Sequence, residues 1–91
     1  MTHIADMTGV ISHWIGERKL REVEAATQID NAYICQICSG KRPLTEKTAV
    51  RLLVGLYGVT ARQAKMMYLI ALRSAIEDRI LLLDSLTNHH A

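Results

Sequence analysis

Residues 20–43 read LREVEAATQIDNAYICQICSGKRP, and this stretch decides the fold. Its apolar residues predict one short helix over about residues 20–27 and a second over about residues 31–39. Asp30 is a good N-cap for the second helix, and Gly40 stands where a helix commonly ends in a left-handed residue. The stretch therefore predicts two helices joined by a tight turn and followed by a basic loop.

Three further helices are expected around this pair, one before it and two after it. Their apolar residues also recur at steps of three and four, and no segment has the pattern of a strand. The expected capping and terminating residues are Asp6 or Thr8, Gly16, Thr45, Gly58, and Thr60 with Gln63 in a capping box. The last helix is expected over about residues 60–87. The 91 residues therefore predict one domain, residues 1–91, that is all-α and compact, with five helices and an extended C-terminal helix.

The expected core is the apolar side of each helix. Trp14, the single Trp of the chain, is interpreted as a core anchor rather than a ligand-stacking residue. The other residues expected in the core are Met7, Val10, Ile11, Ile15, Leu20, Val23, Ala26 or Thr27, Ile34, Ile37, Ala49, Leu52, Leu53, Leu56, Met66, Met67 and Tyr68. This composition suits small helical packing better than a sandwich or a barrel.

Composition and charge narrow the class of protein. No apolar run reaches the roughly 20 residues of a membrane span, and the N-terminus lacks the pattern of a signal peptide. We therefore expect a cytoplasmic protein with reduced thiols and no membrane partner. Residues 17–65 hold nine Lys or Arg against five acidic residues, whereas residues 66–91 hold two against three. The positive charge lies where a phosphate backbone would need it, although a solvated basic surface has the same composition.

The second helix of the pair has two unlike faces. Ile34 and Ile37 lie on one side, toward the preceding helix. The opposite side carries small or polar residues, which are Ala32, Cys35, Gln36 and Ser39, and Asn31 is expected to be exposed at the N-terminal end of the helix. A helix with such an exposed face fits the major groove of double-stranded DNA. The alternative is an ordinary helical hairpin with a polar outer face.

The residue types on the polar face suit contacts to DNA bases. The amides of Asn31 and Gln36 are able to pair with adenine, and Ala32 is able to contact a thymine methyl. The residues better placed for backbone phosphates are Tyr33, Lys41 and Arg42.

Residues 20–43 closely resemble the signature of Xre-type (lambda-repressor-like) helix-turn-helix regulators, a common form of which reads LRxVxxATGISxxYLSQIExGKRP. The resemblance implies a five-helix domain that binds operator DNA, usually as a dimer on a two-fold symmetric site. It places Asn31, Ala32, Cys35, Gln36 and Ser39 where the family contacts bases, and Arg21, Tyr33, Lys41 and Arg42 where it contacts phosphates.

Three residues depart from that signature. Gln28 stands where the family usually has Gly, so a left-handed backbone there would cost about 1 kcal/mol, and a slightly different turn is the alternative. Cys35 replaces a usual Ser on the expected DNA face, and Cys38 replaces a usual Glu beside the basic loop. The two cysteines therefore make the base specificity implied by the family signature uncertain for this chain.

Cys35 and Cys38 stand one helical turn apart. The histidines are His3, His13, His89 and His90. Their spacing does not complete a zinc site, so neither a metal nor a cofactor is expected. The simplest interpretation is two inert thiols, and the alternative is a redox switch. In that alternative, a disulfide between the two cysteines would alter the DNA face. Its formation requires at least one thiol with a lowered pKa, which the nearby Lys41 and Arg42 would provide.

The C-terminal helix is longer than a minimal helix-turn-helix domain needs. Its apolar stripe consists of Leu69, Leu72, Ile76, Ile80, Leu83 and Leu86. We expect the part from about Ala75 to Leu86 to pack against a second copy of the chain, with Ile76, Ile80, Leu83 and Leu86 at the interface. The alternative is that this part folds back on its own domain.

Together these patterns predict a sequence-specific DNA-binding transcriptional regulator. Because a chain of this length leaves no room for a separate effector domain, we expect a repressor that acts as a homodimer by occupying its operator. The alternative is a protein-interaction module whose long helix binds a toxin or another regulator. An enzyme is not expected, since no set of residues typical of catalysis is present.

Overall fold

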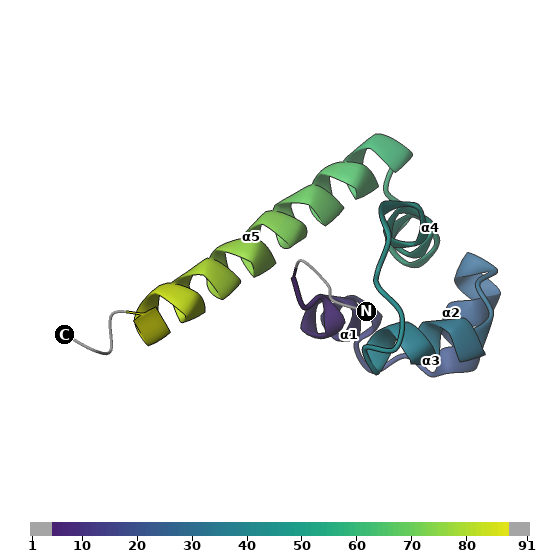
Figure 1. Ribbon diagram of the computed structural model, residues 1–91. Coiled ribbons are helices and arrows are strands. Elements are labelled where there is room, and N and C mark those ends of the chain that lie inside the picture. The colour runs from purple at the N-terminus through teal and green to yellow at the C-terminus, as the bar shows by residue number, and fades with distance from the viewer. Residues whose placement is uncertain (1–4, 88–91) are drawn as a thin grey trace.

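The computed structural model describes residues 5–87, and these residues form five α-helices without a strand. The helices are α1 (Thr8–Ile15), α2 (Leu20–Thr27), α3 (Asn31–Cys38), α4 (Glu46–Tyr57) and α5 (Ala61–Thr87). Helices α1 to α4 and the first half of α5 enclose the core, and the second half of α5 extends away from them (Figure 1). The prediction of an all-α fold with five helices is confirmed for these residues.

Three helices begin directly after capping residues that the sequence predicts. Asp30 Oδ1 accepts a hydrogen bond from the backbone N–H of Ala32 at 3.0 Å and so caps α3. Thr45 caps α4 in the same way. At the start of α5, Thr60 and Gln63 exchange two hydrogen bonds of 3.0 and 3.1 Å, which complete the capping box.

Helix α1 begins one residue later than a cap at Asp6 would place it. The residue before the helix is Met7, whose side chain makes no capping hydrogen bond. Asp6 Oδ1 instead accepts hydrogen bonds from the backbone N–H and the hydroxyl of Thr8, at 2.9 and 2.7 Å. Asp6 therefore stabilises the first turn, and Thr8 is the first helical residue.

The turn between α2 and α3 contains a left-handed residue. Gln28 has φ of 59°, the only positive φ outside glycine among residues 5–87. Helix α4 holds this turn, because Arg51 Nη2 donates to the backbone oxygens of Thr27 at 3.5 Å and Gln28 at 3.1 Å. Gly55, one turn further along α4, packs directly against the end of α2. The left-handed alternative considered for Gln28 is thus the one adopted.

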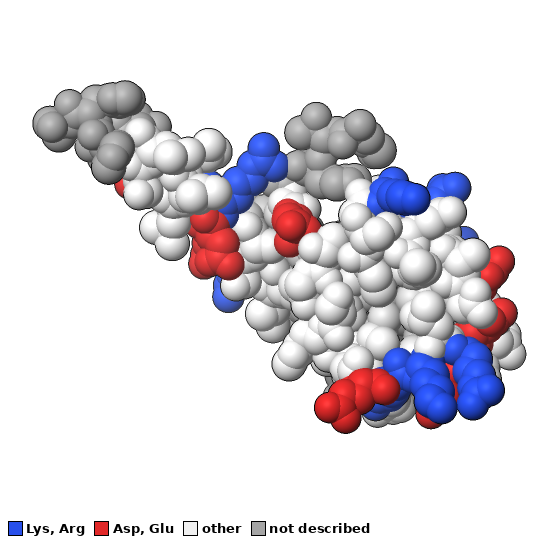
Figure 2. Space-filling model, turned by 90° about the horizontal axis from the view of Figure 1, so that it is seen from below, with Lys and Arg blue, Asp and Glu red and all other residues white. Residues whose placement is uncertain are grey.

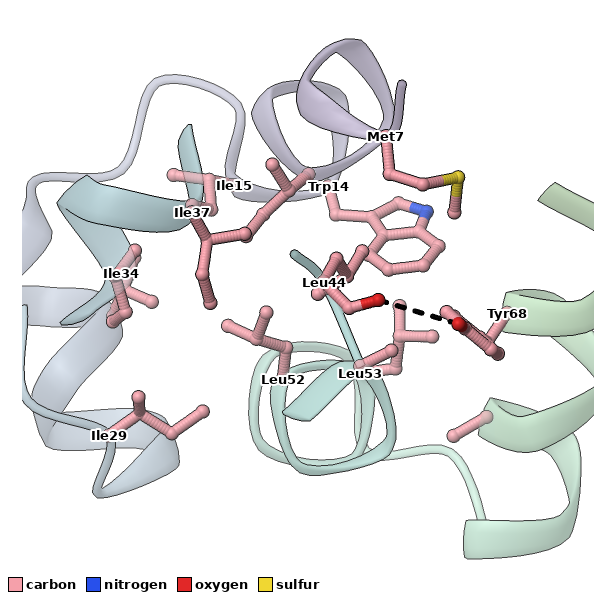
Figure 3. Packing of buried hydrophobic residues seen from close by; sticks show 14 residues of the cluster. Met7, Trp14, Ile15, Ile29, Ile34, Ile37, Leu44, Leu52, Leu53 and Tyr68 are labelled. Atoms are coloured by element: carbon pink, nitrogen blue, oxygen red, sulfur yellow. Dashed lines mark hydrogen bonds between the residues drawn. The ribbon is translucent and has the colours of Figure 1, made fainter. Parts of the chain in front are cut away.

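The core contains side chains from all five helices (Figure 3). Its largest fully buried side chains are Ile11, Val23, Ile34, Ile37, Leu52 and Leu53. Trp14 lies in the same cluster, as predicted. From α5, the Tyr68 hydroxyl donates a hydrogen bond to the backbone oxygen of Leu44 at 3.4 Å, which ties α5 to the loop between α3 and α4 (Figure 3).

A second contact joins the end of α1 to the end of α4. The Tyr57 hydroxyl donates a hydrogen bond to the backbone oxygen of Trp14. The Arg18 guanidinium donates to the backbone oxygen of Ile15 at 3.1 Å and lies 5.1 Å from the centre of the Tyr57 ring. The last carbonyl groups of α1 are therefore satisfied by one side chain that is near in sequence, Arg18, and one that is distant, Tyr57.

Several residues expected in the core lie at the surface. Leu20, Met66 and Met67 are 38%, 57% and 36% exposed. On α5 the inward positions belong to Ala64 and Tyr68, so the two methionines between them point outward. The remaining expected core residues that are not fully buried are Val10 and Leu56, which are half-buried, and Ala26, which is exposed while Thr27 is buried.

The part of α5 beyond Ile76 does not fold back on its own domain. It continues without a break to Thr87, past α1 (Figure 1). Ile76 is half-buried, but Ile80, Leu83 and Leu86 are 58%, 53% and 60% exposed. Among the helices of residues 5–87, none is both long and apolar enough to cross a membrane.

Candidate nucleic-acid interface

Helix α3 separates its residues into an inner and an outer face. Ile34 and Ile37 are buried against α1 and α2. The outer face carries the residues that the sequence assigns to bases: Asn31, Ala32, Cys35 and Ser39 are exposed, and Gln36 is half-buried. Burial of the two isoleucines fixes the rotation of α3 and thereby presents an uncharged, small and polar face to solvent.

The basic loop folds back on the last turn of α3. The backbone oxygen of Gln36 accepts hydrogen bonds from the backbone N–H groups of Lys41 at 2.9 Å and Arg42 at 3.2 Å. The Ser39 hydroxyl donates to the same oxygen at 3.1 Å. Gly40, with φ of 83°, allows the chain to reverse here. These hydrogen bonds hold the loop against α3, so that it forms one continuous surface with the outer face of the helix.

The side chain of Arg42 lies along this surface. Its Nε–H donates a hydrogen bond to Gln36 Oε1, and its guanidinium lies 5.5 Å from the centre of the Tyr33 ring. Arg42 thus contacts two other residues that the sequence assigns to DNA, Gln36 and Tyr33. The sequence does not predict the hydrogen bond between Gln36 and Arg42. It indicates only that the loop after Gly40 follows the end of the helix.

Two other basic side chains assigned to phosphates are exposed. Among the hydrogen bonds and ion pairs of residues 5–87, none involves the side chain of Arg21 or Lys41. Figure 2 shows the underside of Figure 1, where α2 and α3 lie: Lys and Arg side chains gather at two opposite margins, and the surface between them is largely uncharged. Acidic side chains also lie along its edge (Figure 2). The charge on this face is therefore peripheral, around an uncharged centre.

The two cysteines differ in their surroundings. Cys35 is exposed on the outer face, whereas Cys38 is half-buried. Burial raises the pKa of the Cys38 thiol, and the neighbouring Cys35 raises it further. The redox hypothesis needs a thiol with a lowered pKa, and the basic loop does not lower that of Cys38. Within residues 5–87, no three His, Cys, Asp or Glu side chains are grouped to hold a metal ion, and His3, His89 and His90 lie outside the described residues.

A second surface feature lies between α1 and α5. Here a groove of about 770 Å³ opens where α5 leaves the domain. Val10 and Trp14 line it from α1, and Ala75 and Leu82 line it from α5. The groove is continuous with the exposed apolar end of α5 and lies on a different part of the molecule from α3 (Figure 1).

No family model, curated protein or solved structure matches this chain. The assignment of a function therefore depends on the sequence of residues 20–43 and on the surface that these residues form.

Proposed function

We propose that this protein is a sequence-specific, double-stranded DNA-binding transcriptional regulator, which inserts α3 into the major groove. The observation that carries the proposal is the uncharged polar face of α3, against whose end the basic loop with Lys41 and Arg42 is held by hydrogen bonds. An uncharged polar helix face beside a basic loop matches the division of labour in DNA recognition, in which contacts to phosphates fix position and contacts to base edges give specificity. Repression by occupancy of an operator is the simplest mode of action for such a protein.

Within the all-α class, we assign the domain to the lambda-repressor-like type. The support is the signature at residues 20–43 together with the left-handed residue between α2 and α3. In this arrangement Asn31, at the start of α3, and Gln36, half-buried in its last turn, contact bases. Arg21 and Lys41 contact phosphates on either side, since both side chains are exposed.

The regulator is proposed to act as a homodimer through α5. Leu and Ile side chains on the distal part of α5 are more than half exposed, and each such side chain offers on the order of 100 Å² of apolar surface. Monomeric proteins rarely expose an apolar surface of several hundred Å². A two-fold pair of α5 helices would cover it and present two copies of α3 to a two-fold symmetric site.

A protein-interaction module is the second candidate. The groove between α1 and α5, next to the exposed leucines, is the observation that favours it. In this alternative a toxin or another regulator covers α5, and DNA binding is weak or absent. Sedimentation of the isolated protein at micromolar concentration separates the two, because the homodimer needs no partner.

Selection of bound duplexes from a random DNA pool tests the proposal. A two-fold symmetric consensus is the expected result, and recovery of no consensus would refute sequence-specific binding. Gln36→Ala is expected to lose preference at one position in each half-site while retaining affinity for non-specific DNA.

The salt dependence of binding provides a second test with a matched control. Lys41→Met removes a charge beside α3, and Lys65→Met removes the same charge from α5, where Lys65 lies 3.9 Å from Glu46. We expect Lys41→Met to reduce the slope of log affinity against log salt by about 1 and Lys65→Met to leave it unchanged. Equal slopes for both variants would argue against α3 as the DNA-binding helix.

A further inference from the structure

Gln36 has one end of its side-chain amide fixed. The Arg42 guanidinium contains only donors, so the Gln36 atom that meets its Nε–H is the oxygen Oε1. The amide nitrogen Nε2, with its two N–H donors, then points away from Arg42. Without a partner, the last side-chain torsion of a glutamine turns easily between two orientations.

Arg42 is itself held in place. Its backbone N–H donates to the backbone oxygen of Gln36 at 3.2 Å, and its guanidinium lies over the Tyr33 ring at 5.5 Å. A cation over an aromatic ring and a backbone hydrogen bond together restrict a long side chain that is otherwise mobile. Arg42 is therefore able to hold the amide of Gln36 in one orientation.

We propose that Arg42 is a positioning residue that sets the base preference of Gln36. The inference rests on the proposed function of DNA binding. With Oε1 bound to Arg42, Gln36 offers N–H donors to the base edge. Adenine, guanine and thymine each present an acceptor in the major groove, whereas the edge of cytosine presents the N4 amino donor. Gln36 therefore rejects cytosine at the position that it contacts.

Arg42 also links this base contact to a phosphate. Its Nε–H is used by Gln36, and the N–H groups of its two terminal nitrogens remain for a phosphate oxygen. The same side chain thus holds the backbone of the DNA and orients the amide that contacts the base. Lys41, whose side chain has no partner within residues 5–87, adds charge without this second role.

The experiment uses four duplexes that differ only at the position identified by Gln36→Ala in the selection. Affinities are measured for the wild type, Arg42→Met and Lys41→Met. Met keeps an apolar contact with the Tyr33 ring, so Arg42→Met removes the donors with little change in packing. We expect the wild type and Lys41→Met to bind the cytosine duplex about 5-fold or more weakly than the best duplex. In Arg42→Met the freed amide turns its oxygen toward cytosine N4, and the difference falls below about twofold.

Two results would overturn the inference. If Arg42→Met weakens binding to all four duplexes by the same factor, Arg42 contacts phosphate alone, and the proposed function stands without this role. If the wild type binds no duplex selectively, the proposed function fails and the inference fails with it. A measurement without DNA is the NMR signal of the Gln36 side-chain amide, which we expect to move in Arg42→Met and not in Lys41→Met. An unmoved signal would also overturn the inference.

Discussion

A Cβ atom on Gly55 of α4 would lie 2.6 Å from the backbone oxygen of Ala26, near the end of α2. The same atom would lie 3.0 Å from Cα of Thr27. These are backbone atoms, which cannot turn aside as the end of a long side chain can. The close approach of α4 to α2 therefore depends on glycine at position 55, and it positions the turn from which α3 begins.

Gly55→Ala is expected to destabilise the fold by about 1–3 kcal/mol, the usual cost of overpacking a close contact. Gly9→Ala is the matched control, because a Cβ on Gly9 of α1 meets no atom within 4 Å and Ala favours a helix. The measurement is denaturant unfolding of both variants. Equal stabilities of the two variants would show that α4 is able to move away from α2 without loss.

At Gln28, whose backbone is left-handed, a substitution is expected to increase the free energy of unfolding instead of lowering it. Glycine adopts this conformation without strain, so Gln28→Gly is expected to stabilise the protein by up to about 1 kcal/mol. Gln28→Val is expected to destabilise it, since a branched side chain is least tolerant of positive φ. Thermal unfolding gives both values. The Arg51 hydrogen bonds go to backbone oxygens and are retained in both variants.

The contacts of Gly55 and Arg51 with the end of α2 show which features a local sequence pattern does not predict. Local signals predicted the helices: Asp30 and the Thr60–Gln63 pair act on neighbours two or three residues away, and the structure confirms them. The contacts of Arg51 and Gly55 with the end of α2 join residues more than 20 positions apart. Nothing in a local pattern specifies such contacts, because they depend on how the helices pack.

The same limit explains the errors in the expected core. Periodicity indicates that one side of α5 is buried but not which rotation the neighbouring helices select, so Met66 and Met67 were wrongly placed inside. On α3 the two isoleucines define the buried side without ambiguity, and the exposed candidate residues follow. The link between Gln36 and Arg42 again depends on three-dimensional packing.

Alkaline pH is expected to weaken the fold through Tyr68. Burial raises the pKa of the Tyr68 phenol above its ordinary value of 10.0, and the nearby charge of Glu46 raises it further. The folded state thus holds the phenol proton more tightly than the unfolded chain does. The resulting stability is fully present below pH 10 and is lost as the pH rises through the pKa of the folded state.

Tyr68→Phe is the variant that isolates this effect. At pH 7 it lacks the hydrogen bond to the backbone oxygen of Leu44 and is expected to be less stable by about 0.5–1.5 kcal/mol. Above pH 10 the wild type loses stability faster, so the difference between the two proteins shrinks. Unfolding free energies at pH 7 to 11 provide the measurement. A difference that stays constant over this range would contradict the shifted pKa.

The two thiols are expected to react at different rates. Cys38 is half-buried, and its raised pKa lowers its own content of reactive thiolate, whereas Cys35 is exposed and therefore more accessible to a reagent. Alkylation by iodoacetamide at pH 7.5 should therefore be faster in Cys38→Ser, which retains Cys35, than in Cys35→Ser. Equal rates would contradict the burial of Cys38.

The redox hypothesis needs a separate measurement on the wild type. Operator affinity after diamide is compared with affinity after dithiothreitol. The raised pKa of Cys38 disfavours an easily oxidised pair, so equal affinities are the expected result. A large loss of affinity after diamide, absent in Cys38→Ser, would instead assign a switch to the two cysteines.

The apolar end of α5 provides the test of the homodimer. Leu83 belongs to the proposed interface with Ile76 and Ile80, whereas Leu81 lies on the opposite side of the helix and is 66% exposed. Leu83→Asp would place a charge in the interface and is expected to weaken dimerisation about tenfold or more, whereas Leu81→Asp, with the same change of charge, should leave it unchanged. Sedimentation at micromolar concentration measures this directly.

On DNA, Leu83→Asp is expected to lose affinity for the two-fold site and retain affinity for a single half-site, because each α3 is intact. Identical sedimentation of the two variants, or a monomeric wild type, would rule out this interface.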